Sequence, residues 1–222
     1  MEFHLIDLRN HGESPWTGGM QFQGMVNDVT HYMDKHSLEK VSIIGHSMGG
    51  RLAMQVALLY PHLVQNLVVA DVAPVTYPPF NTFNNYISIM KQMDLARCQS
   101  RKDADEMLKP LIADPGIRLF LLTNLTERPG INGFTWKLNL DTIQKSLGEL
   151  RKFEVPSNAR FLGPTLLVGG KNSDYIKPEH YPTIKGFFPS SEIEMIEGAG
   201  HWVHADKPEV FVQHVSKFLT KQ

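Results

Sequence analysis

The chain has 222 residues, of which 42% are hydrophobic and 20% charged, and its formal net charge is -1. That length and composition are typical of one globular domain with a sizeable core. The charge is balanced and no basic cluster stands out in the sequence, so nothing indicates a nucleic acid or an anionic membrane as a partner. No apolar run approaches the roughly 18 residues of a membrane span. The single cysteine, Cys98, excludes an internal disulfide, which fits a protein of a reducing compartment. The charged residues Asp7 and Arg9 near the start are unlike a secretion signal, so we expect that the protein is not secreted.

Short apolar runs alternate with segments of helical periodicity along the chain. Strands are predicted at 3–8, 41–44, 66–70, 164–168 and 192–196, and helices at 21–35, 48–59 and 209–219. The run at 41–44 lacks an alternation of polar and apolar residues, which is typical of a strand buried on both faces. Strands that alternate with helices predict an α/β fold with a mostly parallel sheet flanked by helices.

The pattern changes between residues 77 and 159. This region is mostly helical and rich in Met, Phe and Leu, and a hairpin is expected near residues 130–138. An insertion of this kind between strands indicates a helical cap over one end of a sheet. We therefore expect a core formed by residues 1–76 and 160–222 and a mainly helical cap formed by residues 77–159.

The strongest chemical signal is the segment Gly-His-Ser-Met-Gly at residues 45–49, between a predicted strand and a predicted helix. A strand that turns sharply into a helix holds its corner residue in strained backbone angles and exposes its side chain. We expect Gly45 and Gly49 to relieve the crowding at this turn and Gly50 to let the helix approach the strand. The pattern predicts Ser47 as a nucleophile.

A serine nucleophile needs a base, and histidine is the side chain that titrates near neutral pH. His201 follows the last predicted strand, so its loop can reach the same carboxyl edge of the sheet as Ser47. His204 lies later in that loop, and His46 adjoins the nucleophile and is expected to shape the site. The backbone N–H of Met48, at the start of the helix, is expected to stabilise an oxyanion. Since no histidine shows a metal-ligand spacing, we expect no metal.

Three aspartates compete for the role of the acid that orients the histidine. Asp71 ends the predicted strand at 66–70, and a charged residue there needs a partner when buried. Asp174 follows the strand at 164–168, but it stands one position later than the usual Gly-x-x-Asp spacing from Gly170. Asp141 looks like the N-cap of a cap helix. We rank Asp71 first, Asp174 second and Asp141 third.

With these residues in place, the chain resembles the α/β-hydrolase superfamily over its full length. More narrowly, it resembles the alpha/beta hydrolase domain-containing protein 11 group and the related bacterial YbfF-type esterases. The matching segments are Asp7-Leu8-Arg9-Asn10-His11-Gly12-Glu13-Ser14, Gly45-His46-Ser47-Met48-Gly49-Gly50, Asp71-Val72-Ala73-Pro74-Val75, Leu121-Leu122-Thr123-Asn124-Leu125, Asn139-Leu140-Asp141, Leu162-Gly163-Pro164-Thr165 and Gly200-His201-Trp202-Val203-His204-Ala205-Asp206.

The resemblance implies a cofactor-free serine esterase or lipase that cleaves carboxylic esters, such as acyl lipids, through a Ser-His-Asp triad. It also implies that Asp71 is favoured over Asp174, because members of the narrower group often lack the Asp of Gly-x-x-Asp. For the eukaryotic group it implies a mitochondrial matrix setting and a link to the 2-oxoglutarate dehydrogenase complex. Neither nucleic acid nor a transmembrane segment is expected.

The chain differs from the superfamily at its N-terminal end. The superfamily normally has three strands and a helix before the segment that matches residues 3–8, and its loop with the second oxyanion N–H comes before that segment too. We therefore interpret the chain as a fragment, an alternative product or an incomplete gene model that lacks the first three strands. The rival interpretation is that another chain supplies these first strands, for example by swapping. Loss of one oxyanion donor costs about a hundredfold or more in rate.

Apolar side chains recur at near-helical spacing in the expected cap, and such stripes usually indicate burial. We therefore expect most of them to pack the cap, and we keep Phe80 and Phe83, with His46 and Trp202, as candidates for substrate binding. Two other functions remain open. One is an impaired remnant that acts as a binding or regulatory protein, and the other is hydrolysis of thioesters or carbon–carbon bonds on the same fold.

Overall fold

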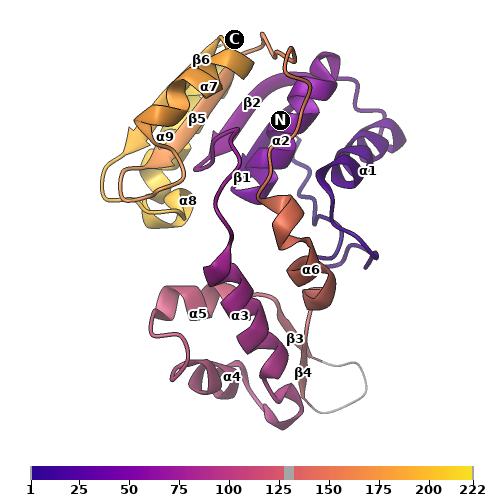
Figure 1. Ribbon diagram of the computed structural model, residues 1–222, viewed down its shortest axis with the longest axis vertical. Coiled ribbons are helices and arrows are strands. Elements are labelled where there is room, and N and C mark those ends of the chain that lie inside the picture. The colour runs from indigo at the N-terminus through magenta and orange to yellow at the C-terminus, as the bar shows by residue number, and fades with distance from the viewer. Residues whose placement is uncertain (1, 128–132, 222) are drawn as a thin grey trace. The chain divides into compact units, whose positions relative to one another are not determined.

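The computed structural model describes residues 2–127 and 133–221 and divides into two compact units (Figure 1). We call Phe22–Tyr77 with Lys152–Gln222 the sheet unit, and Met1–Gln21 with Pro78–Arg151 the helical unit. The helical unit combines residues 1–21 with residues 78–151, and residues 77 and 152–159 belong to the sheet unit. The expected division into a core of 1–76 and 160–222 and a cap of 77–159 stays a prediction.

The sheet unit is built on one parallel sheet. Its strands are β1 (Val41–His46), β2 (Val64–Ala70), β5 (Thr165–Gly170) and β6 (Ser191–Ile196), in the order β1-β2-β5-β6. Every pairing is parallel, and the register aligns Ile44 with Val68 and Val68 with Leu166. The predicted α/β class with a parallel sheet is confirmed, and because all four strands run the same way, their carboxyl ends meet at one edge.

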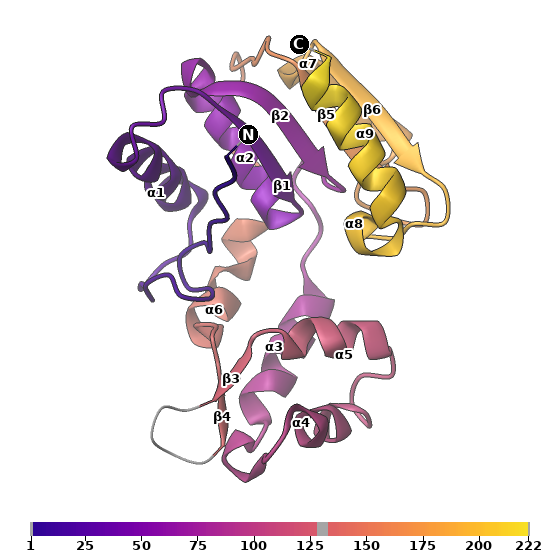
Figure 2. The same ribbon diagram turned by 180° about the vertical axis from the view of Figure 1, so that it is seen from behind.

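Helices cover both faces of this sheet. Val68 and Ala70 of β2 pack in a buried cluster with Val215 and Phe218 of α9 (Pro208–Thr220). Val69, between them, points to the opposite face and meets Gly50 of α2 (Met48–Leu59). Figure 2 shows α9 lying across β5 and β6, and α1 (Phe22–Lys35) packs against α2. The remaining elements of this unit are η1 (Pro61–Leu63), η3 (Pro178–His180), α7 (Tyr181–Phe187) and α8 (Val203–Asp206).

Two expectations about strands are wrong. Residues 3–8 lie in the described part of the chain but form no strand, and Leu5 is 97% exposed there. An apolar run becomes a strand only where a neighbouring strand satisfies its backbone groups. β1 does form, yet it is not buried on both faces, since Ser42 and Ile44 are exposed. The reason is its position, because the described sheet ends at β1.

The helical unit consists mainly of short helices. They are α3 (Asn81–Gln92), η2 (Leu95–Arg97), α4 (Arg101–Leu108), α5 (Pro115–Leu122) and α6 (Leu140–Leu150). The expected hairpin is present as β3 (Leu125–Glu127) paired antiparallel with β4 (Phe134–Trp136), and residues 128–132 lie outside the described residues. The indole of Trp136 donates a hydrogen bond to the carbonyl of Met90, 3.0 Å away, which ties the hairpin to α3.

Asparagines rather than Asp141 organise the start of α6. The side chain of Asn139 accepts a hydrogen bond from the Thr142 N–H and so caps the helix, which corrects the expectation that Asp141 is the cap. Asn139 also donates to the side chain of Asn10. Asn10 is fully buried with φ 67°, a conformation that asparagine tolerates better than most residues, and it accepts a further bond from Thr17 N–H.

Within the described ranges 2–127 and 133–221, the helices are all too short or too polar to cross a membrane.

Candidate active site

Ser47 stands at a sharp turn between β1 and α2. Its φ of 52° is a left-handed value that costs an L-residue free energy unless the surroundings enforce it. Its N–H donates to the carbonyl of Ala70 at the end of β2, which holds the turn against the sheet. A Cβ added at Gly45 would lie 2.3 Å from the backbone oxygen of Gly49, and one at Gly50 would lie 2.9 Å from the Gly45 oxygen. The expected need for glycine at 45 and 50 is confirmed.

The expectation for Gly49 is wrong. A Cβ there would meet none of the described atoms within 4 Å. Gly49 lies in the first turn of α2, where the side chain direction leads away from the strand. Of the three glycines at this turn, steric crowding therefore requires glycine at positions 45 and 50 but not at position 49.

His201 joins the serine to a carboxylate. It lies in the loop between β6 and α8, and its Nε2 is 3.0 Å from Ser47 Oγ. Its Nδ1 is 2.8 Å from Asp71 Oδ2. Because a carboxylate only accepts, the proton belongs on Nδ1, and Nε2 is then free to accept the proton of the serine hydroxyl. The geometry is that of a nucleophile, a base and an orienting acid in one hydrogen-bonded chain.

Asp71 lies directly after β2, is fully buried and has φ 48°. Its Oδ1 accepts a hydrogen bond of 3.0 Å from the Gly170 N–H, and its Oδ2 accepts from the Ser173 hydroxyl as well as from His201. A buried carboxylate is costly unless its oxygens are satisfied in this way. The three donors hold both oxygens in place, so Asp71 presents Oδ2 to the imidazole in one orientation.

The other two acids lie elsewhere. The side chain of Asp174 is 94% exposed and pairs with Lys177 at 3.1 Å. Asp141 belongs to the helical unit, where its carboxylate pairs with Lys91 at 2.5 Å. Lys91 lowers the pKa of Asp141 by hydrogen bonding and by its charge. Of the three candidates ranked from the sequence, the structure brings only Asp71 to His201.

Sequence reasoning missed two residues, Ser173 and Tyr175, that contact Asp71 and His201. Ser173 occupies the position three after Gly170 where an acid is usual, and there it donates to Asp71 instead. The ring of Tyr175 stacks on His201, with centroids 4.0 Å apart and planes at 23°. The sequence did contain a signal for Ser173. Because Asp174 stands one position late, the Gly-x-x-Asp position is occupied by the serine hydroxyl instead of a carboxylate.

His46, which we expected near the substrate, forms a hydrogen bond within the protein. Its Nε2 is 2.7 Å from the carbonyl oxygen of His201 and donates to it. Burial lowers the pKa of His46 to about 4, so the imidazole is neutral at pH 7. Burial also lowers the pKa of His204, whose ring lies 4.7 Å from that of His46. His46 therefore fixes the backbone of the loop that carries His201.

The remaining expected site residues are placed as follows. Met48 is the first residue of α2, and N–H groups of a first helical turn have no acceptor within the helix, so this N–H is a suitable oxyanion donor. The ring of Trp202 lies edge-on 5.6 Å from His201. Phe80 and Phe83 are in the helical unit, with centroids 5.7 Å apart, and their role in substrate binding stays a prediction. In the described ranges, no group of histidine, cysteine and carboxylate side chains could hold a metal ion.

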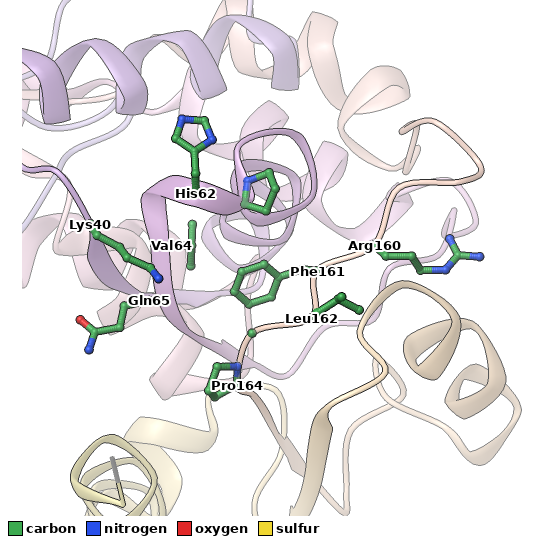
Figure 3. A pocket seen from close by; sticks show the side chains of 10 residues that line it. Lys40, His62, Val64, Gln65, Arg160, Phe161, Leu162 and Pro164 are labelled. Atoms are coloured by element: carbon green, nitrogen blue, oxygen red, sulfur yellow. The ribbon is translucent and has the colours of Figure 1, made fainter.

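The sheet unit also has a cavity of about 610 Å³, which Figure 3 shows from close by. Its lining includes Lys40 just before β1, Val64 at the start of β2 and Pro164 just before β5. These positions are the amino ends of the strands, whereas Ser47 and Asp71 follow the carboxyl ends. The cavity is therefore at the edge opposite the candidate active site.

Comparisons with known proteins show the family of the chain. Residues 1–208 match the family model described as alpha/beta hydrolase fold. The chain belongs to the alpha/beta hydrolase fold family.

Several members of that family are similar to the chain. It is 39% identical to the sn-1-specific diacylglycerol lipase ABHD11 of Danio rerio, over 96% of this chain and 68% of the relative. It is 27% identical to Esterase YbfF of Escherichia coli, over 96% of this chain and 81% of that protein. A solved structure titled marine microorganism esterase matches with a TM-score of 0.91 and 35% identity, over 96% of this chain and 82% of that one. These matches confirm the resemblance seen in the sequence and show that the chain is shorter than its relatives.

Proposed function

We propose that the chain cleaves carboxylic esters through a triad of Ser47, His201 and Asp71 and a covalent acyl-enzyme. The chain is a carboxylic ester hydrolase by its family and its named relatives. The observation that carries the assignment of residues is the hydrogen-bonded chain from Ser47 Oγ to His201 Nε2 (3.0 Å) and from His201 Nδ1 to Asp71 Oδ2 (2.8 Å).

Acylation follows from these contacts. Ser47 Oγ attacks the ester carbonyl carbon while its proton moves to His201 Nε2, and the carbonyl oxygen becomes an oxyanion. The Met48 N–H at the start of α2 donates to that oxyanion. When the tetrahedral intermediate collapses, the carbon–oxygen bond to the alcohol breaks, and His201 returns its proton to the leaving alkoxide.

Deacylation repeats the sequence with water. His201 takes a proton from the water as its oxygen attacks the acyl carbon, and then protonates Ser47 Oγ as the acid leaves. Asp71 accepts the hydrogen bond of Nδ1 and stabilises the imidazolium that forms twice in each cycle. Its fixed position, with Gly170 and Ser173 as further donors, keeps the imidazole in the productive tautomer.

The substrate we propose is an acylglycerol or a related acyl ester. This rests on the diacylglycerol lipases among the relatives, which are named for that substrate and are about 39% identical to the chain. Hydrolysis of thioesters or carbon–carbon bonds differs only in the substrate. Turnover of diacylglycerol compared with an acyl thioester of the same chain length distinguishes ester hydrolysis from thioester hydrolysis, and a carbon–carbon substrate of similar size tests the third activity.

The test of the triad is covalent labelling with a fluorophosphonate probe. We expect the wild-type chain to be labelled once, the Ser47→Ala variant to be unlabelled, and Ser216→Ala, an exposed serine on α9, to be labelled as the wild type. Failure of a folded wild-type chain to react would contradict the proposal and favour the binding or regulatory remnant.

The mitochondrial matrix setting and the association with the 2-oxoglutarate dehydrogenase complex are proposals from the family resemblance. Fractionation of cells that express the chain from its complete gene, followed by affinity purification, tests both. Recovery in another compartment without the complex contradicts them and leaves the proposed chemistry intact.

A further inference from the structure

Tyr77 forms a bridge between two loops of the sheet unit that carry the triad. Its hydroxyl accepts a hydrogen bond of 2.8 Å from the Ala73 N–H, in the loop that begins with Asp71. The same hydroxyl donates a hydrogen bond of 2.6 Å to the carbonyl of Tyr175, in the loop that follows β5. One phenol group thus fixes the distance between the ends of β2 and β5.

The loop after β5 makes two contacts with the triad. Ser173 donates its hydroxyl proton to Asp71, and the ring of Tyr175 covers one face of His201. The two residues are coupled, because the Tyr175 N–H donates to Ser173 Oγ at 3.2 Å. A shift of this loop therefore moves a donor of the acid and the stacking partner of the base together.

The ring of Tyr77 is itself held by Arg51. Tyr77 is 7% exposed, and the Arg51 guanidinium lies 5.3 Å from its ring centroid. Arg51 is on α2, one helical turn after Ser47, and it donates to the carbonyls of Val75, at 2.8 Å, and Lys152. Burial lowers the pKa of Arg51 to about 10, which still leaves it charged at pH 7, and burial raises the pKa of Tyr77, so the phenol keeps its proton.

We propose that Tyr77 is a positioning residue, which locks the Ser173–Tyr175 loop onto the Asp71 loop and thereby aligns His201 between Ser47 and Asp71. The inference rests on the proposed function and adds to it a group that touches no reacting atom. Its physical basis is that a shift of about 1 Å in a catalytic group can cost a hundredfold in rate.

The test is Tyr77→Phe, which removes both hydrogen bonds and keeps the ring over which Arg51 lies. We expect kcat per fluorophosphonate-labelled site on a chromogenic ester to fall roughly tenfold to a hundredfold, with KM near the wild-type value. Tyr181→Phe, at the start of α7, is the matched control and should keep kcat. A loss of folded protein lowers the number of labelled sites, whereas misalignment lowers the rate at each site.

A second measurement does not depend on turnover. A proton on His201 Nδ1 that is bonded to a buried carboxylate gives a proton NMR signal far downfield, which is assigned by its absence in His201→Gln. We expect Tyr77→Phe to shift or broaden this signal and Tyr181→Phe to leave it unchanged.

The two measurements separate the outcomes. An active wild-type chain whose Tyr77→Phe variant keeps both kcat per site and the downfield signal overturns the inference and leaves the triad in place. An unreactive wild-type chain whose downfield signal still changes in Tyr77→Phe overturns the proposed function, while the alignment of His201 by Tyr77 stands.

Discussion

Replacement of Asp71 by asparagine tests the proposed triad most directly. The substitution keeps the shape of the side chain, and asparagine tolerates the positive φ of 48° at this position. Oδ1 accepts from the Gly170 N–H, a fixed backbone donor, so the amide oxygen of the variant is expected to stay there. The amide NH₂ then takes the place of Oδ2, opposite His201 Nδ1.

An NH₂ group cannot accept the Nδ1 proton. His201 must therefore place its proton on Nε2, which then faces Ser47 and cannot take the serine proton. The wrong tautomer in a triad of this geometry lowers kcat by about 10⁴-fold, or roughly 5 kcal/mol of activation free energy. We expect the melting temperature to change little by comparison, because the variant keeps the hydrogen bond from Gly170.

The assay is the initial rate of chromogenic ester hydrolysis, normalised to folded protein, beside Asp174→Asn. The Asp174 side chain is 94% exposed and forms its ion pair with Lys177, away from His201, so its variant should retain activity. Retention of activity within tenfold by Asp71→Asn, with loss in Asp174→Asn, would refute the assignment of the acid.

Two further predictions concern the nucleophile turn and the histidine beside it. Gly45→Ala should destabilise the fold by about 3 kcal/mol or more, because its Cβ would lie 2.3 Å from a backbone oxygen. Gly49→Ala, in the open first turn of α2, should raise stability by about 0.5 to 1 kcal/mol, and equal melting temperatures for the two variants would contradict the packing described here. His46, whose pKa burial lowers to about 4, is protonated more readily in the unfolded chain. Between pH 6.5 and about 4 the unfolded state therefore binds more protons than the folded state. The free energy of unfolding should decrease as the pH is lowered from 6.5 to about 4. His46→Gln, whose amide can still donate to the His201 carbonyl, should show a shallower fall in urea unfolding at these pH values, and an unchanged slope would mean that His46 is not the group responsible.

Local sequence was sufficient to predict most elements of the sheet unit and the turn that carries Ser47. The glycines at 45 and 50 precede and follow a serine between an apolar run and a helical pattern, and only a tight strand-to-helix turn requires that arrangement. Helices α1, α2 and α9 and strands β2, β5 and β6 lie where periodicity placed them, because short-range spacing determines which face can be buried. The loop of His201 followed from the same order of strands and helices.

Tertiary structure alone decided which aspartate lies beside His201 and which residues of β1 are exposed. Asp71 and Asp174 both follow strands whose carboxyl ends meet at one edge, so position along the chain could not separate them. The register of β2 on β5 brings Gly170 and the Ser173 hydroxyl to Asp71, while Asp174 points to solvent and Lys177. The exposure of Ile44 likewise depends on whether a neighbouring strand lies beside β1. Both outcomes depend on contacts between residues far apart in sequence, and a local pattern of residue types carries no information about which distant groups supply them.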